Sequence, residues 1–182
     1  SGFIGACSGM NNQGLKVTIN AAKSSIPTDA AKPIALLARE ILQYAKNIDE
    51  AIATAKKRDV FESESILVGS ALDNKTISIE KSPTKMDVYE VPNSNQIICP
   101  NHYQGKDYEN DIANLNNQIE SSSLYRNIRL KQLLANNDTI NYLQAASILR
   151  NQKGLNDKNI GLTNEKGLNQ LLAHHAVIFK PQ

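Results

Sequence analysis

Three polar side chains stand where predicted elements begin or end, and their chemistry suits the binding of negative charge: Asn20, Asn101 and Arg126. Asn20 ends an alternating apolar run, Asn101 ends another run directly after a proline, and Arg126 opens a predicted helix after a serine cluster. An Asn side chain can donate N–H bonds to a developing oxyanion. Because Asn at a strand end also serves as a turn residue, spacing alone leaves both interpretations open.

The two cysteines, Cys7 and Cys99, are far apart and lack metal-ligand spacing. We expect two reduced, buried thiols rather than a disulfide, so the cellular compartment stays unknown. Cys7 lies in a Gly-Ala-Cys-Ser-Gly setting that could expose a thiol, yet the sequence places no His to activate it. A small buried side chain is therefore favoured at Cys7, and a free-standing thiol nucleophile is the alternative.

Other chemical motifs are missing from the sequence. It has no phosphate-binding glycine loop, no His-Glu-x-x-His, no Cys-x-x-Cys and no Gly-x-Ser-x-Gly. His174 and His175 are adjacent, so on a strand they would point to opposite faces and could not chelate one metal ion. We therefore predict neither a metal nor a cofactor.

Alternating apolar residues indicate the strands that must position these side chains. The run 15–19 follows a turn at residues 11–14, which predicts a hairpin that ends on Asn20. Four further runs joined by short turns predict an antiparallel meander, and a last strand candidate lies near the end of the chain. The meander strands are 65–71, 76–80, 86–91 and 96–99, and the last candidate is 176–179.

Apolar residues at spacings of three and four predict four helices. They cover residues 34–46, after Pro33, residues 47–58, with Asn47 as cap, residues 124–134 and residues 140–149. On the third helix we expect Leu124, Ile128, Leu130, Leu133 and Leu134 to form the apolar side. The polar stretches 104–122 and 151–167 are predicted to be loops. Helices interspersed with antiparallel strands predict an α+β fold.

Composition bounds the class of protein. The 182 residues, 41% apolar and 21% charged, suit a single domain, residues 1–182. A net charge of +2 argues against a nucleic-acid partner, and no apolar run is long enough to span a membrane. Both ends look like strands, so we interpret the chain as a piece of a longer polypeptide, soluble and either cytoplasmic or exported.

Five short motifs in order make the sequence similar to a known family. The opening hairpin, Gly9-Met10-Asn11-x-x-Gly14-Leu15 followed by Asn20, resembles a hairpin of the N-terminal-nucleophile (Ntn) amidohydrolases. The best resemblance is to the acyl-coenzyme A:6-aminopenicillanic acid acyltransferase family, related to choloylglycine hydrolase and acid ceramidase. The other motifs are Leu37–Leu42 with Asp49–Ala51, Ile79–Pro83, Pro100–His102, and Ser123 with Arg126 and Arg129.

The resemblance implies an Ntn-type αββα sandwich, in which antiparallel sheets are covered by helices. It also implies that an N-terminal cysteine, freed by autoproteolysis, attacks an amide or related acyl bond of a small molecule while its α-amino group acts as base. Asn20 and Asn101 match positions where the family has Asn near the nucleophile, and Arg126 would support the nucleophile or the leaving group.

Two departures from the family pattern matter. The nucleophilic Cys-Thr-Ser and the Arg-Asn-x-Asp strand of the family are absent, and Cys7 lies inside the hairpin that should follow the nucleophile. We therefore expect an incomplete sandwich whose nucleophile comes from another segment or chain of the same precursor, with a homo-oligomer as a further possibility. The alternative function is a non-catalytic α+β binding or interaction module that keeps the fold.

Overall fold

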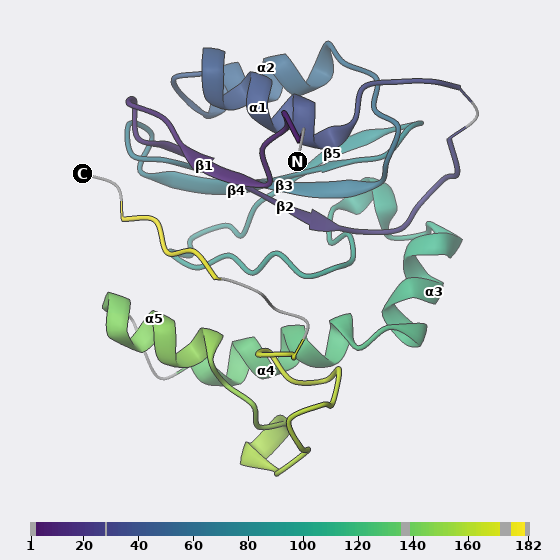
Figure 1. Ribbon diagram of the computed structural model, residues 1–182. Helices are drawn as coiled ribbons and strands as arrows, with labels where there is room; N and C mark the ends of the chain where they lie inside the picture. The colour runs from purple at the N-terminus through teal and green to yellow at the C-terminus, as the bar shows by residue number, and fades with distance from the viewer. Residues whose placement is uncertain (1–2, 28, 136–138, 172–175, 181–182) are drawn as a thin grey trace. The chain divides into compact units, whose positions relative to one another are not determined.

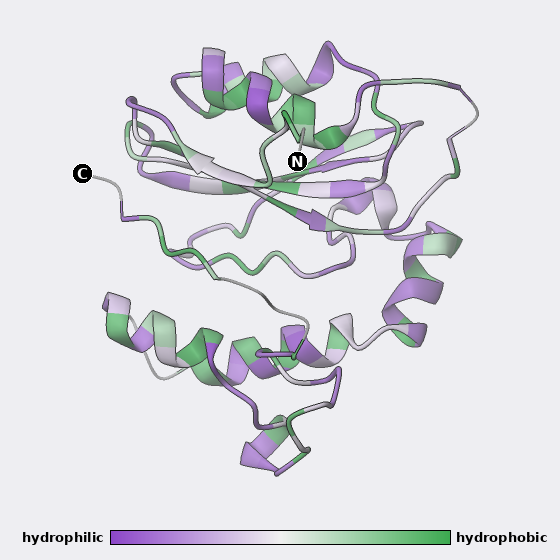
Figure 2. Cartoon of the chain, viewed as in Figure 1, coloured by the Kyte–Doolittle hydropathy of each residue, from purple (hydrophilic) through white to green (hydrophobic). Residues whose placement is uncertain are grey.

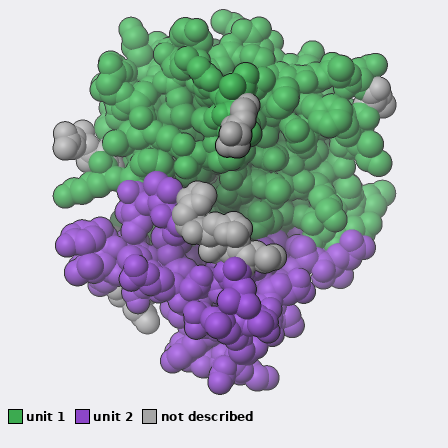
Figure 3. Space-filling model, viewed as in Figure 1, with its two compact units in different colours: residues 1–117, 179–182 green, residues 118–178 purple. Residues whose placement is uncertain are grey.

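The computed structural model describes residues 3–27, 29–135, 139–171 and 176–180. The chain divides into two compact units, which Figure 3 shows in different colours. The first unit comprises Ser1–Asn117 and Phe179–Gln182, and the second comprises Gln118–Ile178. None of the helices in the described ranges is long and apolar enough to cross a membrane.

The first unit is built on one five-stranded antiparallel sheet with strand order β1-β2-β3-β4-β5. The strands are β1 (Ser8–Met10), β2 (Leu15–Ala21), β3 (Glu64–Ser70), β4 (Lys75–Lys81) and β5 (Met86–Tyr89). Asn11 fixes the first turn, because its Oδ1 accepts hydrogen bonds from Gln13 N and Leu15 N, both at 3.0 Å. Gly14 completes that turn with a φ of 74°, a left-handed conformation that glycine adopts without strain.

Two helices, α1 (Ile34–Tyr44) and α2 (Ile48–Lys56), cover one face of this sheet (Figure 1). Pro33 precedes α1, and the Asn47 side chain caps α2 by accepting the Glu50 N–H at 2.9 Å. Their green, apolar sides in Figure 2 meet the sheet. The core between them includes Leu37, Ala38, Ile41 and Ala51 from the helices and Leu15, Val17, Ile66, Val68, Ile77 and Ile79 from the strands.

The opening hairpin is tied to α1 by a side chain as well as by packing. The Nδ2 of Asn11 donates to the carbonyls of Leu42 at 3.1 Å and Ala45 at 2.8 Å. Leu42 is in the last turn of α1 and Ala45 is its C-cap, where carbonyls lack intrahelical partners. Asn11 therefore satisfies the helix end and fixes the hairpin against it. The predicted hairpin, the strands that became β3, β4 and β5, and the two helices of this unit are confirmed.

Three further predictions of local structure are wrong. Residues 96–99 and 176–179 form no strand, and the predicted loop 104–122 contains the short helix η1 (Lys106–Tyr108) and the helix α3 (Ile112–Glu120). The α3 helix escaped detection because its buried residues are Asn114 and Asn117 rather than apolar side chains. Asp111 starts it, since its Oδ1 accepts the Asn114 N–H at 3.0 Å.

The second unit contains α4 (Ser123–Leu134), α5 (Tyr142–Leu149) and the short helix η2 (Leu155–Asp157). The predicted apolar side of α4 is wrong: Leu124 and Ile128 are 41% and 42% exposed, whereas Asn127 and Arg129 are buried. Arg129 explains this orientation, because its guanidinium donates to Asp157 at 2.7 Å and thereby binds the 151–157 loop to α4. A polar network, not an apolar core, orients α4.

The described residues therefore confirm the α+β class, with helices layered on an antiparallel sheet as an Ntn-type sandwich requires.

Candidate functional site

The face of the sheet that α1 and α2 leave uncovered carries polar side chains. Because residues alternate along a strand, the residues beside the core positions point to this second face. The strand register aligns four of them in one row across β2, β3, β4 and β5: Asn20 pairs with Ser65, Ser65 with Glu80, and Glu80 with Asp87. A thiol, Cys99, lies beside the neighbouring row, with its Sγ 3.8 Å from Ser78 Oγ.

Asn20 and Asn101 come together over this row. The Asn20 Nδ2 donates to the Cys99 carbonyl at 2.5 Å, and the Asn101 Nδ2 donates to the Ala21 carbonyl at 3.1 Å. Each side-chain amide therefore binds a backbone carbonyl close to the other Asn residue. Two hydrogen bonds thus join the end of β2 to the 99–101 segment. Figure 1 draws the segment that follows β5, in teal, on the side of the sheet away from α1 and α2. The fold therefore brings together two of the three predicted site residues.

The backbone around Asn101 is held from several directions. Asn117 of α3 donates to the Asn101 carbonyl at 2.6 Å. Asn114 of α3 accepts the Tyr103 N–H at 2.8 Å, and the Tyr103 hydroxyl donates to the Lys81 carbonyl at 2.5 Å. Since a side chain is fixed by the backbone that carries it, these bonds preorganise the Asn101 amide.

Glu80 belongs to the Ile79–Pro83 motif, but the sequence analysis gave it no role at the site. Its side chain is 1% exposed, and its carboxylate accepts the backbone N–H groups of Gln104 and Gly105. Burial raises the pKa of Glu80 to about 7, the two backbone hydrogen bonds lower it, and the Asp87 carboxylate raises it further. The available signal was the strand alternation, which puts Glu80 on the same face as Asn20.

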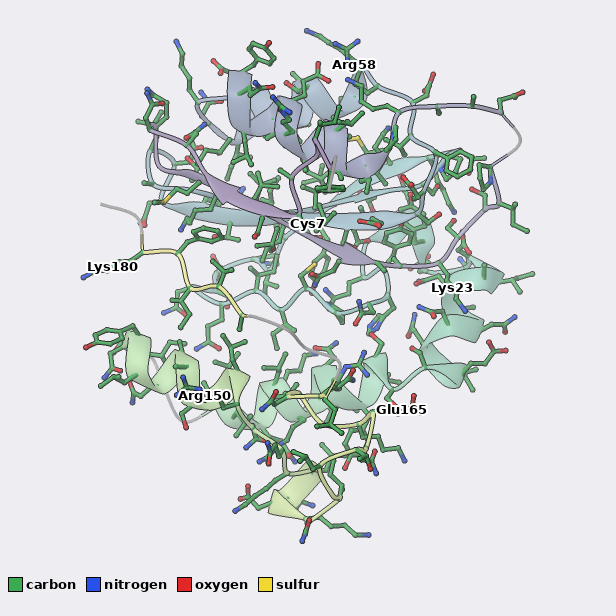
Figure 4. All side chains as sticks on the ribbon, viewed as in Figure 1. Cys7, Lys23, Arg58, Arg150, Glu165 and Lys180 are labelled. Carbon is green, nitrogen blue, oxygen red and sulfur yellow. The ribbon has the colours of Figure 1, made fainter. Side chains whose placement is uncertain are left out.

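The two cysteines differ from the prediction that both are buried. Cys7, which Figure 4 labels, is exposed, so that prediction is wrong for this residue. Cys99 is half-buried, and both thiols are free as expected. Burial raises the pKa of Cys99 to about 11, which keeps its thiol protonated at neutral pH. Cys7 pairs with Ile19, since the Ile19 N–H donates to the Cys7 carbonyl at 3.0 Å. Ile19 packs on the helix-covered face, opposite to Asn20.

Arg126 lies on α4 in the second unit. Its Nη1 donates to the Glu165 carbonyl at 2.8 Å, and burial lowers its pKa. This contact orients the guanidinium within its own unit. A role for Arg126 beside the two Asn side chains stays a prediction.

No group of metal-binding side chains occurs in the part of the chain that the structure describes. His174 and His175 lie outside the described residues.

A cavity of about 900 Å³ opens at the other end of the first unit's polar face. Its volume is within the range of about 300–1,000 Å³ that small-molecule sites occupy. Lys16, which lies four residues before Asn20 on β2, contributes a cation to its wall, and partial burial lowers the pKa of this lysine. The other lining residues are Ser70, Ala71, 74–76 and 90–97.

The five-stranded antiparallel sheet and the helices layered on it are consistent with an Ntn-like sandwich. The model of one family, acyl-coenzyme A:6-aminopenicillanic acid acyl-transferase, matches residues 1–167, and the chain belongs to this family. A search of curated proteins finds no match. The family match confirms the resemblance seen in the sequence, and with it the general class of chemistry.

Proposed function

We propose that this chain provides the oxyanion-binding part of a cysteine Ntn amidohydrolase or acyltransferase, and that its nucleophile lies outside these 182 residues. The observation that supports this most directly is the pair of crossed bonds from Asn20 to Cys99 and from Asn101 to Ala21. An Asn side-chain amide supplies N–H donors of the kind that stabilise a developing oxyanion. The two crossed bonds hold both amides at one place, the end of β2.

In the proposed reaction an N-terminal cysteine gives its thiol proton to its own α-amino group, and the thiolate attacks the acyl carbon. The carbonyl oxygen becomes an oxyanion that accepts N–H bonds from Asn20 and Asn101. Collapse of this intermediate breaks the C–N bond, and the α-ammonium group returns a proton to the leaving amine. Water then hydrolyses the thioester, or a second amine takes the acyl group. We propose that Arg126 supports the nucleophile or the leaving group.

The state of the two thiols supports a nucleophile from elsewhere. Cys99 stays protonated at neutral pH. The Cys7 backbone pairs with Ile19, which packs on the helix-covered face of the sheet, opposite to Asn20. We propose that autoproteolysis of a precursor frees the nucleophile, and that this chain is a fragment forming one domain with it. A homo-oligomer of the chain is a further possibility, and the native mass of the purified assembly tests it.

The substrate is proposed to be a small amide or a related acyl compound. The cavity beside Lys16 has room for such a molecule and is lined largely by polar groups. Four residues of strand, about 13 Å at 3.3 Å per residue, separate Lys16 from Asn20. A substrate that used both places would have to be elongated.

Substitution of the two Asn residues tests the proposal in the full-length precursor. We expect N20A and N101A each to lower kcat about 100- to 1,000-fold, because each removes one oxyanion donor. The matched control is N12A, in the exposed hairpin turn, which should leave kcat unchanged. Hydrolysis is followed by release of the free amine from a panel of N-acyl compounds. Full activity of both variants would contradict an oxyanion role.

The second candidate is a non-catalytic α+β binding module. One observation favours it: both Asn amides already bind backbone carbonyls and so act as structural ties. It predicts that the native protein releases no amine from any N-acyl compound, and that N20A and N101A lower thermal stability only. The enzyme hypothesis predicts release of amine that depends on a single reactive N-terminal cysteine. The N-terminal sequence of the native protein therefore separates the two.

A further inference from the structure

The structure contains a pair of carboxylates, one buried and one half-buried, that the proposed reaction does not use. Glu80 on β4 and Asp87 on β5 are register partners, and both point to the polar face of the sheet. A Cβ atom added to Gly105 would lie 2.3 Å from an Asp87 carboxylate oxygen and 2.9 Å from a Glu80 oxygen. The two carboxylates therefore meet at one point of backbone, where only glycine fits.

Both carboxylates accept hydrogen bonds from the same stretch of backbone. Glu80 accepts the Gln104 N–H at 2.8 Å and 3.0 Å, one distance to each oxygen, and the Gly105 N–H at 2.7 Å. Asp87 accepts the Asp107 N–H at 3.0 Å. Burying the Glu80 carboxylate is costly, and hydrogen bonds to ionised groups are about twice as strong as neutral ones. The pair consequently holds the segment 104–107 firmly on the sheet.

This segment follows Asn101 by three residues, and Glu80 stands in the row that begins with Asn20. The carboxylate therefore fixes where the segment crosses the sheet relative to Asn20. The Gln104 side chain also holds the backbone that precedes Asn101, since its Nε2 donates to the Ile98 carbonyl at 2.8 Å. Asn101 thus lies between two stretches of backbone that Gln104 and Glu80 hold.

We propose that Glu80 is a positioning residue whose carboxylate, beside that of Asp87, holds the 104–105 backbone so that the Asn101 amide stays next to Asn20. This inference rests on the proposed function, because only an oxyanion-binding role requires Asn20 and Asn101 to be held at fixed positions. Glu80 itself touches no substrate.

Several titratable groups face Glu80 from the elements packed against it. They are Asp87 and Tyr89 on β5 and Cys99, Tyr103 and Tyr108 on the covering segment. The pKa values of the thiol and the three phenols are all raised, so these groups are neutral at pH 7. As pH falls through about 7, protonation of Glu80 weakens its bonds to the backbone N–H groups.

Nuclear magnetic resonance of the ¹⁵N-labelled protein between pH 5.5 and 8.5 tests the proposal. We expect the N–H signals of Gln104 and Gly105 to titrate with a midpoint near 7, and the Asn101 side-chain NH₂ signals to shift with the same midpoint. E80Q should abolish all three titrations. The control E90Q, at an exposed glutamate just after β5, should retain them. An Asn101 amide that does not respond to pH in the wild-type protein would overturn the proposal, even if E80Q failed to fold.

Kinetics in the full-length precursor give a second, separate readout. E80Q should lower kcat up to about 100-fold with KM unchanged, as misplacement of a catalytic group by about 1 Å does. It should also remove a limb near pH 7 from the pH profile of kcat. A precursor that hydrolyses no amide would refute the proposed function, whereas the resonance titration decides the role of Glu80 independently.

Discussion

The buried Glu80 carboxyl makes a quantitative prediction about stability and pH. Its pKa is about 7 in the folded chain, against the ordinary glutamate value of 4.5, which describes the unfolded chain. Between these pH values the folded protein holds a proton that the unfolded protein has lost. The free energy of unfolding therefore decreases as pH rises from 4.5 to 7 and is constant beyond it.

The size of this effect follows from the difference of about 2.5 pKa units. At about 1.36 kcal/mol per unit, ionisation of Glu80 lowers the free energy of unfolding by about 3 kcal/mol. Glu40 does not obscure the measurement, because ion pairs with Arg58 and Lys32 hold its pKa at about 2, and it stays ionised throughout the window. Burial raises the pKa of Glu64 in the same direction, so a subtraction is needed.

Urea unfolding of the wild-type protein and of E80Q between pH 4.5 and 8 supplies this subtraction. The chain has no tryptophan, but the rings of Tyr103 and Tyr108 lie 4.0 Å apart and give a near-ultraviolet circular dichroism signal from the first unit. The wild-type advantage over E80Q should shrink by about 3 kcal/mol between pH 4.5 and 7.5. A difference between the two proteins that is independent of pH would refute the reasoning. The E90Q control should show no such change relative to the wild-type protein.

Three further predictions concern the hairpin, the core and the thiols. N11A should cost about 2–4 kcal/mol in urea unfolding, because four hydrogen bonds at about 1 kcal/mol each are lost; a cost below 1 kcal/mol would contradict its structural role. L37A, at a fully buried position of α1, should cost about 2–5 kcal/mol, while L72A, 70% exposed, should cost little. Iodoacetamide at pH 7.5 should label the exposed Cys7 within minutes and leave the folded Cys99 unmodified, which mass spectrometry can measure. Equal labelling of both thiols would contradict the lower exposure and the raised pKa of Cys99.

Local patterns in the sequence were sufficient to predict those helices and strands that bury an apolar face of their own. Alternation predicted the opening hairpin and β3 to β5, and apolar spacing with the Asn47 cap predicted α1 and α2. These elements bury one apolar face each, so burial and periodicity carry the same information. The motif order also identified the family that the comparison confirms.

Patterns failed where polar groups take the buried positions. The α3 helix buries Asn114 and Asn117, and α4 buries Arg129 while Leu124 stays exposed. Hydrophobic periodicity has no signal for a face that is held by hydrogen bonds. For the same reason the apolar run 96–99 looked like a strand, although its residues lie over the polar face of the sheet and form no ladder.

The sequence by itself determined the class of the fold, the two helices on the sheet and the candidate residues Asn20 and Asn101. Only the tertiary structure decided that these two amides cross over one another's backbone, and that Glu80 anchors the segment beside them. The physical reason is distance along the chain. Asn20, Glu80 and Asn101 are joined through strand register and through side-chain bonds to remote carbonyls and N–H groups, and no local pattern encodes such bonds.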